Sequence, residues 1–315
     1  MDSSLKLASS RWDSIASVRS SPDSYDLNLD SNVTKTNSWH LPGYSGILSE
    51  PEFSGLRPHE IDYVMGVQML EFLSKQARFE IECVNTVAQC IAFDRYPFNI
   101  SQSYKLDALK IYTDEGYHSF FTKKLADQII VHFKISSLDI DSIVCSHFAK
   151  IAAIGKSFAD DFSYLANLAV VFVAENQIIG DLTEQMRSIV HKPIVSMFRD
   201  HMVDESFHAK YFASLLPIIW EQMTEVQRYV FGACLCESML VLGRPRTDIY
   251  FLSLSSLGFS HDLISKCINN KYDNDEWNTC RVRERMKPTL QLLDSVGMFN
   301  SDEIMNVFQS KGLLA

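Results

Sequence analysis

The feature that most restricts the fold is a helical periodicity that starts near Pro58 and continues toward the C-terminus. Over this stretch apolar residues recur about every 3.6 residues, and the alternation typical of β-strands is nearly missing. The chain has only 12 Gly and 9 Pro in 315 residues, which is few for many short strands and turns. The sequence therefore predicts an all-α fold, and with 46% hydrophobic residues the chain can bury a sizeable core.

The composition divides the chain into two parts. Residues 1–55 are rich in Ser, Asp and Asn, which predicts an irregular N-terminal arm over the domain surface. Residues 56–315 are expected to form one helical domain, with core helices at about 59–223 and satellite helices at 224–315. The expected helices span about 59–96, 103–133, 138–153, 161–190, 193–223 and 224–242, and three shorter ones follow, including 247–257 and 301–313. Pro217 is expected to kink the helix 193–223.

Charge and composition exclude several classes of protein. A net charge of −10 argues against a nucleic-acid-binding protein, which would carry a basic face. The N-terminus has no apolar stretch typical of a signal peptide, and Glu175 and Glu237 interrupt the longest apolar runs, so no membrane span is expected. The seven cysteines include no CxxC pair, so neither a zinc ribbon nor a disulfide framework is predicted. A cytoplasmic protein is expected.

Four of the expected helices carry polar residues where the apolar stripe should continue. The interrupting residues are Glu80 on the first, Glu115 and His118 on the second, Glu175 on the third, and His201, Glu205 and His208 on the fourth. Burying ionised carboxylates without a partner costs several kcal/mol each, so such a layer requires a compensating cation. The alternative is that some of these residues face solvent or pair with Lys and Arg, few of which lie on these stripes.

The second and fourth of these helices share the pattern Asp-Glu-small-aromatic-His, at 114–118 and 204–208. A Glu and a His three residues apart lie on one helix face and can bind one metal ion together. Two such motifs, with one Glu from each of two other helices, form the ligand set of di-iron and di-manganese bundles. The two helical hairpins also match in length, at about 16 residues out and 13 back, and about 15 out and 12 back.

Three further residues belong to this pattern. His201 precedes Glu205 by four residues on the same face, which makes it either a third imidazole ligand or a core histidine. Asp114 and Asp204 lie one turn before the motif histidines. They are expected to accept a hydrogen bond from the non-coordinating nitrogen of the opposite motif's histidine, or else to be ordinary surface carboxylates.

The pattern of a Glu, a Glu-x-x-His, a lone Glu and a His-x-x-x-Glu-x-x-His resembles the p-aminobenzoate N-oxygenase family of non-haem di-iron enzymes. The resemblance extends over roughly residues 60–220 and implies a ferritin-like four-helix bundle. It also implies two iron ions, O₂ as co-substrate, a homodimer, and oxidation of an amine nitrogen to a hydroxylamine, nitroso or nitro group. The ligands implied by the resemblance are Glu80, Glu115, His118, Glu175, His201, Glu205 and His208.

The substrate and the electron source are less restricted by the sequence. No GxGxxG nucleotide-binding motif is found, so an external reductase or other electron donor is expected. The substrate is expected to be a small-molecule amine of specialised metabolism: an amino acid, a carrier-tethered aminoacyl group or an arylamine. Lys75 is the basic residue nearest the inward side of the first helix. The candidate pocket residues are Lys75, Phe72, Tyr112, Phe121, Phe172 and Phe198, although aromatic residues in a bundle are more often plain core.

Three other functions remain open at this point. One is a related di-iron or iron–manganese oxidase that acts at carbon. Another is a ferritin-like protein that stores or buffers metal without catalysis, and the third is a helical scaffold without metal. Radical storage as in ribonucleotide reductase is not favoured, because Tyr117 is adjacent to the ligand motif but points away from the ligand face.

Overall fold

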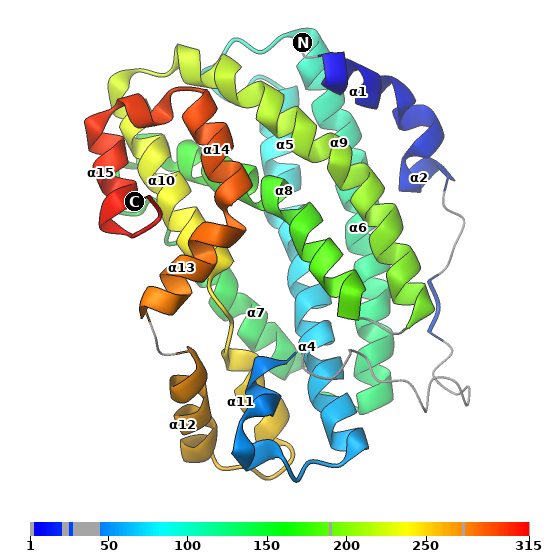
Figure 1. Ribbon diagram of the computed structural model, residues 1–315. Coiled ribbons are helices and arrows are strands. Elements are labelled where there is room, and N and C mark those ends of the chain that lie inside the picture. Colours follow the sequence, from blue (N-terminus) through cyan, green and yellow to red (C-terminus); the bar gives the residue numbers. More distant parts are fainter. Residues whose placement is uncertain (1–2, 21–24, 28–44, 189–190, 273–274, 315) are drawn as a thin grey trace.

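The computed structural model describes residues 3–20, 25–27, 45–188, 191–272 and 275–314. These residues form an all-α bundle and include no strand, which confirms the predicted fold class (Figure 1). The central bundle consists of four long helical units. Their bounds are Pro58–Phe79 (α4) continued by Asn85–Ala92 (α5), Gln102–Phe133 (α6), Ser163–Ser188 (α8) and Lys192–Gln222 (α9).

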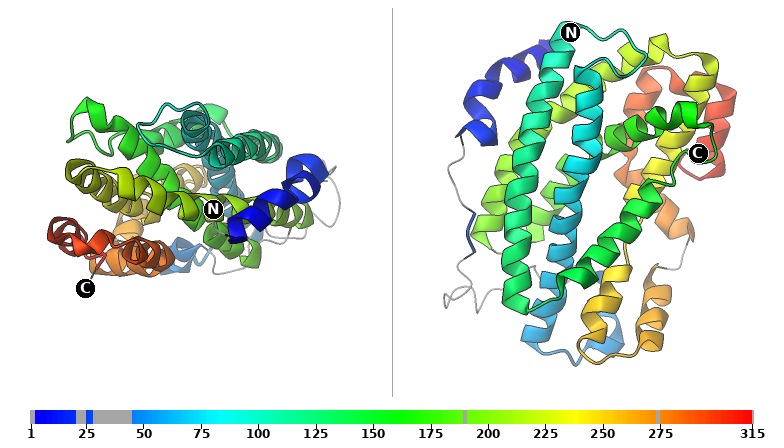
Figure 2. Two further views of the ribbon diagram at one scale, coloured as in Figure 1. Left: turned by 90° about the horizontal axis from the view of Figure 1, so that it is seen from above. Right: turned by 180° about the vertical axis from the view of Figure 1, so that it is seen from behind.

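The four units pack as two hairpins around one apolar core. Helices α4 and α5 lie along α6, and α8 lies along α9, as the two views in Figure 2 also show. The first hairpin turns after α5 and the second between α8 and α9. Helix α7 (Ser137–Ile151) and a short 3₁₀ turn (Asp160–Phe162) connect the two hairpins. This arrangement brings the middle of all four units to one level of the bundle.

The first unit is not a uniform α-helix. Between α4 and α5, residues Glu80–Val84 form a π-helical turn (η3), in which the Asn85 N–H donates to the Glu80 carbonyl five residues earlier. Such wide turns occur mostly as single turns within α-helices, frequently at functional sites. Glu80 therefore begins the one π turn that the described residues contain. The sequence pattern predicted a continuous helix here and did not show this turn.

Helix α8 stands out for its apolar composition. Residues Asp160–Arg187 are apolar and long enough to cross a membrane by length and composition, and no other described helix is. Most of the apolar part of this helix is buried inside the protein, where it packs against α9 and α10 (Glu225–Gly243). Its composition is therefore that of a helix surrounded on most sides by others.

The C-terminal region contains more helices than the three shorter ones predicted. They are α11 (Asp248–Ser255), α12 (His261–Tyr272), α13 (Asp275–Arg285), α14 (Lys287–Ser295) and α15 (Asp302–Ser310), with a 3₁₀ turn at Met298–Asn300. Gly258 and Gly297 follow α11 and α14 with φ of +91° and +74°, a left-handed backbone that ends a helix. The ends at Gly258 and Gly297 match the expected helices 247–257 and 301–313, whereas the stretch between them forms three helices (α12, α13 and α14) where one was expected.

The N-terminal arm also differs from the irregular extension predicted. Residues Ser3–Ile15 (α1) and Ser17–Ser20 (α2) are helical, and short 3₁₀ turns follow at Gly46–Ser49 and Pro51–Phe53. Helix α1 packs on α9, and α2 packs on α6 and α9. Polar residues of the arm form hydrogen bonds with side chains of the bundle. These contacts explain why a segment with a composition typical of disorder is helical here. Residues 28–44 of the arm lie outside the described residues.

Candidate metal centre

Seven side chains from the four bundle units meet in the interior at one level. They are the seven that interrupt the predicted apolar stripes: Glu80, Glu115, His118, Glu175, His201, Glu205 and His208. All are buried, and the most exposed is Glu175 at 3%. The convergence follows from the two hairpins, each of which returns the chain to the level that it left.

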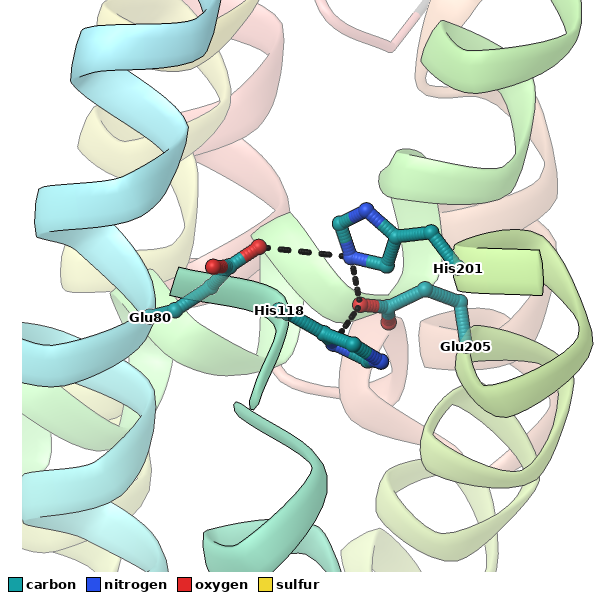
Figure 3. Close-up of side chains that lie close together, drawn as sticks. All are labelled: Glu80, His118, His201 and Glu205. Carbon is teal, nitrogen blue, oxygen red and sulfur yellow. Dashed lines mark hydrogen bonds and ion pairs between the residues drawn. The ribbon is translucent and has the colours of Figure 1, made fainter. Parts of the chain in front are cut away.

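One group of four consists of Glu80, His118, His201 and Glu205 (Figure 3). The Nε2 atom of His201 lies 3.3 Å from Glu80 Oε1 and 2.8 Å from Glu205 Oε1. The Nδ1 atom of His118 lies 3.6 Å from the same Glu205 oxygen. One ligand atom from each of the four residues falls within 4.8 Å of the others, a spacing that a single metal ion could bridge.

A second group consists of Glu115, His118, Glu205 and His208. The Nδ1 atom of His208 lies 2.9 Å from Glu115 Oε1 and 3.4 Å from Glu205 Oε2. It also lies 3.6 Å from Glu175 Oε2, which adds the fourth carboxylate to this side. Glu205 and His118 belong to both groups, so Glu205 would be a ligand shared by two ions held there.

Many ligand atoms of the cluster make no hydrogen bond with the described residues, although His208 Nδ1 and Glu115 Oε1 lie 2.9 Å apart. The atoms without a hydrogen bond are Glu80 Oε2, both Glu115 oxygens, His118 Nδ1, Glu175 Oε2, Glu205 Oε2 and His208 Nδ1. Leaving a buried polar group unpaired costs roughly 1–3 kcal/mol, and more for a charged one. Unpaired atoms gathered at one point, all of types that bind transition metals, fit a pair of metal ions.

The pKa shifts of the cluster residues also fit a pair of metal ions. Burial raises the pKa of both Glu80 and Glu175. Burial alone would lower the pKa of His118 and His208, but the surrounding carboxylates outweigh it and raise both. Without metal, protons therefore neutralise the cluster. Four carboxylates with three neutral imidazoles balance the charge of two divalent cations, which would displace these protons.

Asp114 and Asp204 pair crosswise with the motif histidines, in the arrangement that the sequence predicts. His118 Nε2 on α6 lies 2.9 Å from Asp204 Oδ2 on α9, and His208 Nε2 on α9 lies 3.2 Å from Asp114 Oδ2 on α6. Each carboxylate can accept the Nε2–H, which leaves Nδ1 free to face the cluster. The crosswise pairs therefore orient both imidazoles and join the two helices.

Other polar contacts at the centre were not predicted from the sequence. Gln76 Nε2 donates to Glu80 Oε1 at 3.0 Å. Gln76 lies one helical turn before Glu80 in the sequence, so this contact could have been predicted from the spacing. Trp12 Nε1 donates to both oxygens of Asp114, and the Ser17 main-chain N–H donates to Asp204. These two residues precede the periodic part of the chain, where no pattern indicated a contact with the bundle.

A cavity of about 310 Å³ opens between α4, α8 and the C-terminal helices. Phe72 and Lys75 line it, as expected for pocket residues. Its basic side chains exceed its acidic ones by six to three; the six are Lys75, Arg244, Arg246, Lys271, Arg281 and Arg285. A smaller cavity of about 40 Å³ shares Lys75 with it and is also lined by Gln76 and Glu175. Lys75 thus lines both cavities, and the smaller one reaches Glu175 of the metal centre.

Lys75 differs from the other cations of this wall. Arg246 pairs with Glu71, and Arg285 pairs with Asp181. Among the described residues no carboxylate lies within ion-pair distance of the Lys75 ammonium, which sits 5.4 Å from the centre of the Phe72 ring. Burial, reinforced by the charge of Arg246, lowers the pKa of Lys75 to about 7.

The remaining predicted pocket residues lie elsewhere. Phe198 packs edge-on against Phe72 at 5.7 Å between ring centres, behind the cavity wall. Phe172 is core, at 2% exposure, and Phe121 packs against His118 and His201. The prediction that Tyr112 lines a buried pocket was wrong, because this residue is 41% exposed. It follows the buried Ile111 directly, and successive residues of an α-helix point about 100° apart.

The family model described as P-aminobenzoate N-oxygenase AurF matches residues 14–297, which is most of the chain. The matched range includes all seven residues of the cluster and both aspartates. No curated protein matches the chain.

Proposed function

Because this chain belongs to the p-aminobenzoate N-oxygenase family, we propose that it uses O₂ and a pair of iron ions to oxidise the nitrogen of a small-molecule amine. The observation that carries the proposal is the cluster of four glutamates and three histidines, buried and with its ligand atoms unpaired. Two iron ions held there would supply the activation of O₂. The protein contributes ligands, orientation and a dry site.

The side chains of the centre have different roles in the proposed reaction. Glu205 lies in both ligand groups and would be a ligand to both ions. Asp114 and Asp204 keep the histidine Nδ1 atoms directed at the centre. Buried apolar residues such as Phe121, which packs against His118 and His201, exclude water that would compete with the amine.

We propose an amine that carries an acidic group as the substrate. The support is the excess of basic side chains in the large cavity and the unpaired ammonium of Lys75 at its junction with the smaller one. An anionic group held by Lys75 would leave the rest of the molecule directed toward Glu175. The reacting nitrogen must be neutral, since a protonated amine has no lone pair. This favours an arylamine, and a separate reductase is proposed as the electron donor.

A single-turnover reaction tests the proposal. Protein loaded with Fe²⁺ is mixed with ¹⁸O₂ and a panel of amines, and products are identified by mass spectrometry. The expected result is ¹⁸O on nitrogen, formed by the wild type and by Glu82→Ala, whose side chain pairs with Arg78 at the surface. The double variant Glu115→Ala/His208→Ala should bind iron only at background level and form no product.

Other outcomes would identify the rival functions. Oxygen found on carbon would indicate a hydroxylase acting at carbon. Stoichiometric iron without any product would favour a storage protein. Wild-type protein that binds no iron would reject the metal centre.

A further inference from the structure

The N-terminal helices α1 and α2 lie against α6 and α9, the two helices that carry the Glu-x-x-His motifs (Figure 1). Three residues of the N-terminal arm, two from these helices and one from the described stretch 25–27 that follows them, each touch a group that supports a site histidine. They are Trp12, Ser17 and Tyr25, and we refer to them as the N-terminal clamp. The ligand pattern of the bundle helices does not by itself require any of them.

Trp12 holds Asp114. The indole Nε1–H donates to both carboxylate oxygens at 2.9 Å, and Asp114 Oδ2 also lies 3.2 Å from His208 Nε2. A donor shared equally between two oxygens fixes the plane of the carboxylate, because rotation would lengthen one of the two contacts. The direction in which His208 presents Nδ1 to the centre is then fixed as well.

Ser17 holds Asp204 in the same manner, from the backbone. Its main-chain N–H lies 3.2 and 3.1 Å from the two carboxylate oxygens, and Asp204 Oδ2 lies 2.9 Å from His118 Nε2. Ser17 and Asp204 are each 3% exposed, so water hardly competes for these contacts. A hydrogen bond to a carboxylate is strong in such surroundings.

Tyr25 acts through aromatic packing. Its ring meets Phe121 edge-on at 5.4 Å, and Phe121 lies 5.4 Å from the ring of His118 and 5.6 Å from that of His201. The Tyr25 hydroxyl donates to Asp200 Oδ2 at 2.7 Å, next to His201 in the chain. The third imidazole is thereby braced from the same segment.

We propose that the N-terminal clamp consists of positioning residues for the metal centre. Trp12 and Ser17 act through Asp114 and Asp204, and Tyr25 acts through Phe121. The inference rests on the metal centre of the proposed function and adds that the N-terminal segment sets how firmly the ions are held. Trp12 precedes residue 14, where the family match begins, so its contact is a feature of this chain outside the matched range.

Two substitutions remove the clamp's donors with little other change. Trp12→Phe removes the indole N–H and keeps an aromatic ring. Ser17→Pro removes the main-chain N–H at the first residue of α2, a position where proline fits. Ser17→Ala is the matched control: it keeps the N–H and loses only a hydroxyl that has no partner among the described residues. Each protein is loaded with Co²⁺, and its ligand-field absorption and its rate of Co²⁺ release to excess chelator are measured.

We expect Trp12→Phe and Ser17→Pro to shift the Co²⁺ absorption and to release the ion about 10–100-fold faster, whereas Ser17→Ala matches the wild type. Because Trp12 acts through Asp114, Trp12→Phe should add almost nothing to the effect of Asp114→Asn in a double variant. Additive effects would overturn this route.

The outcomes separate the clamp from the proposed function. Wild-type spectra and release rates in Trp12→Phe, with an unchanged circular dichroism spectrum, overturn the clamp and leave the metal centre intact. Trp12→Phe decides the matter alone if Ser17→Pro does not fold. A wild-type protein that binds no Co²⁺ overturns the metal centre itself, and the clamp with it.

Discussion

Replacement of Lys75 by Met should stabilise the fold and weaken the binding of an anionic amine. Methionine keeps the length of the apolar stem but removes the ammonium. In the native protein Lys75 is partly buried, its pKa is lowered to about 7, and among the described residues its ammonium has no carboxylate partner. The charge therefore costs stability, and we attribute its presence to substrate binding.

The expected magnitude follows from the pKa. It falls from an ordinary 10.5 to about 7, and each pKa unit corresponds to roughly 1.4 kcal/mol, which gives an upper limit of about 5 kcal/mol. Lys75 is partly exposed, so solvent screening reduces the expected gain to about 2–3 kcal/mol. Because the folded pKa lies below the unfolded one, the cost is fully present below about pH 7 and disappears as the pH rises toward 10.5.

Urea denaturation of the metal-free protein measures this gain. Lys75→Met should be more stable than wild type at about pH 6, and the difference should shrink at about pH 9. Lys271→Met, which removes an exposed cation of the same cavity, should change the free energy of unfolding by less than about 0.5 kcal/mol. An equal or lower stability of Lys75→Met at about pH 6 would refute the reasoning.

Enzyme kinetics test the second part of the prediction, which is weaker binding of an anionic amine. Loss of a hydrogen bond to a charged group costs about 1.5–3 kcal/mol, so KM for an acidic arylamine should rise about 10- to 100-fold while kcat changes little. An uncharged arylamine should show no such change. In the wild type, kcat/KM for the acidic amine should fall above about pH 7 as Lys75 loses its proton, and the variant should lack this fall. A loss of kcat with both amines would contradict binding as the role of Lys75.

Three further predictions concern packing, pH and metal binding. Gly66→Ala should cost about 1–3 kcal/mol in urea denaturation, because its Cβ would lie 2.1 Å from the Phe133 ring. Gly116→Ala, with nothing within 4 Å, should instead gain about 0.5–1 kcal/mol. Glu175 and His118 have pKa values raised above their unfolded values of 4.5 and 6.5, so they contribute stability at low pH that is lost as the pH rises. Chelator-treated protein should therefore have a lower Tm at about pH 8 than at about pH 6. Added Co²⁺ should raise the Tm more at the higher pH. Asp114→Asn should weaken Co²⁺ binding about 10–100-fold in a competition assay, whereas the surface variant Glu82→Ala should not.

The convergence of the seven side chains could be predicted from the sequence for a specific physical reason. A carboxylate or imidazole on an apolar helical stripe must face the core, and the hairpin lengths then fix its level. Glu80 and Glu175, on different helices, could be placed in one layer in this way. The crosswise pairing of Asp114 and Asp204 followed from the same geometry.

The features that the sequence did not show depend on contacts rather than on periodicity. Trp12 and Ser17 lie in a segment whose composition is typical of disorder, and their helices are held by bonds to groups more than 100 residues away. The stretch between the expected helices 247–257 and 301–313 forms three helices (α12, α13 and α14), a division that its apolar pattern did not indicate. Tyr112 was misplaced because one residue along a helix changes the face.

The π turn at Glu80 has a consequence for how the centre can adapt. A side chain on a regular α-helix can move mainly by changing its rotamer, since every neighbouring peptide is held in the same ladder. The Glu80 carbonyl instead accepts from the Asn85 N–H five residues later, which interrupts the regular ladder, so we expect its own peptide to shift while the flanking turns stay in place. Of the four glutamates, Glu80 is the one that begins this turn, so we expect its backbone to be the one that adjusts when the charge held at the centre changes.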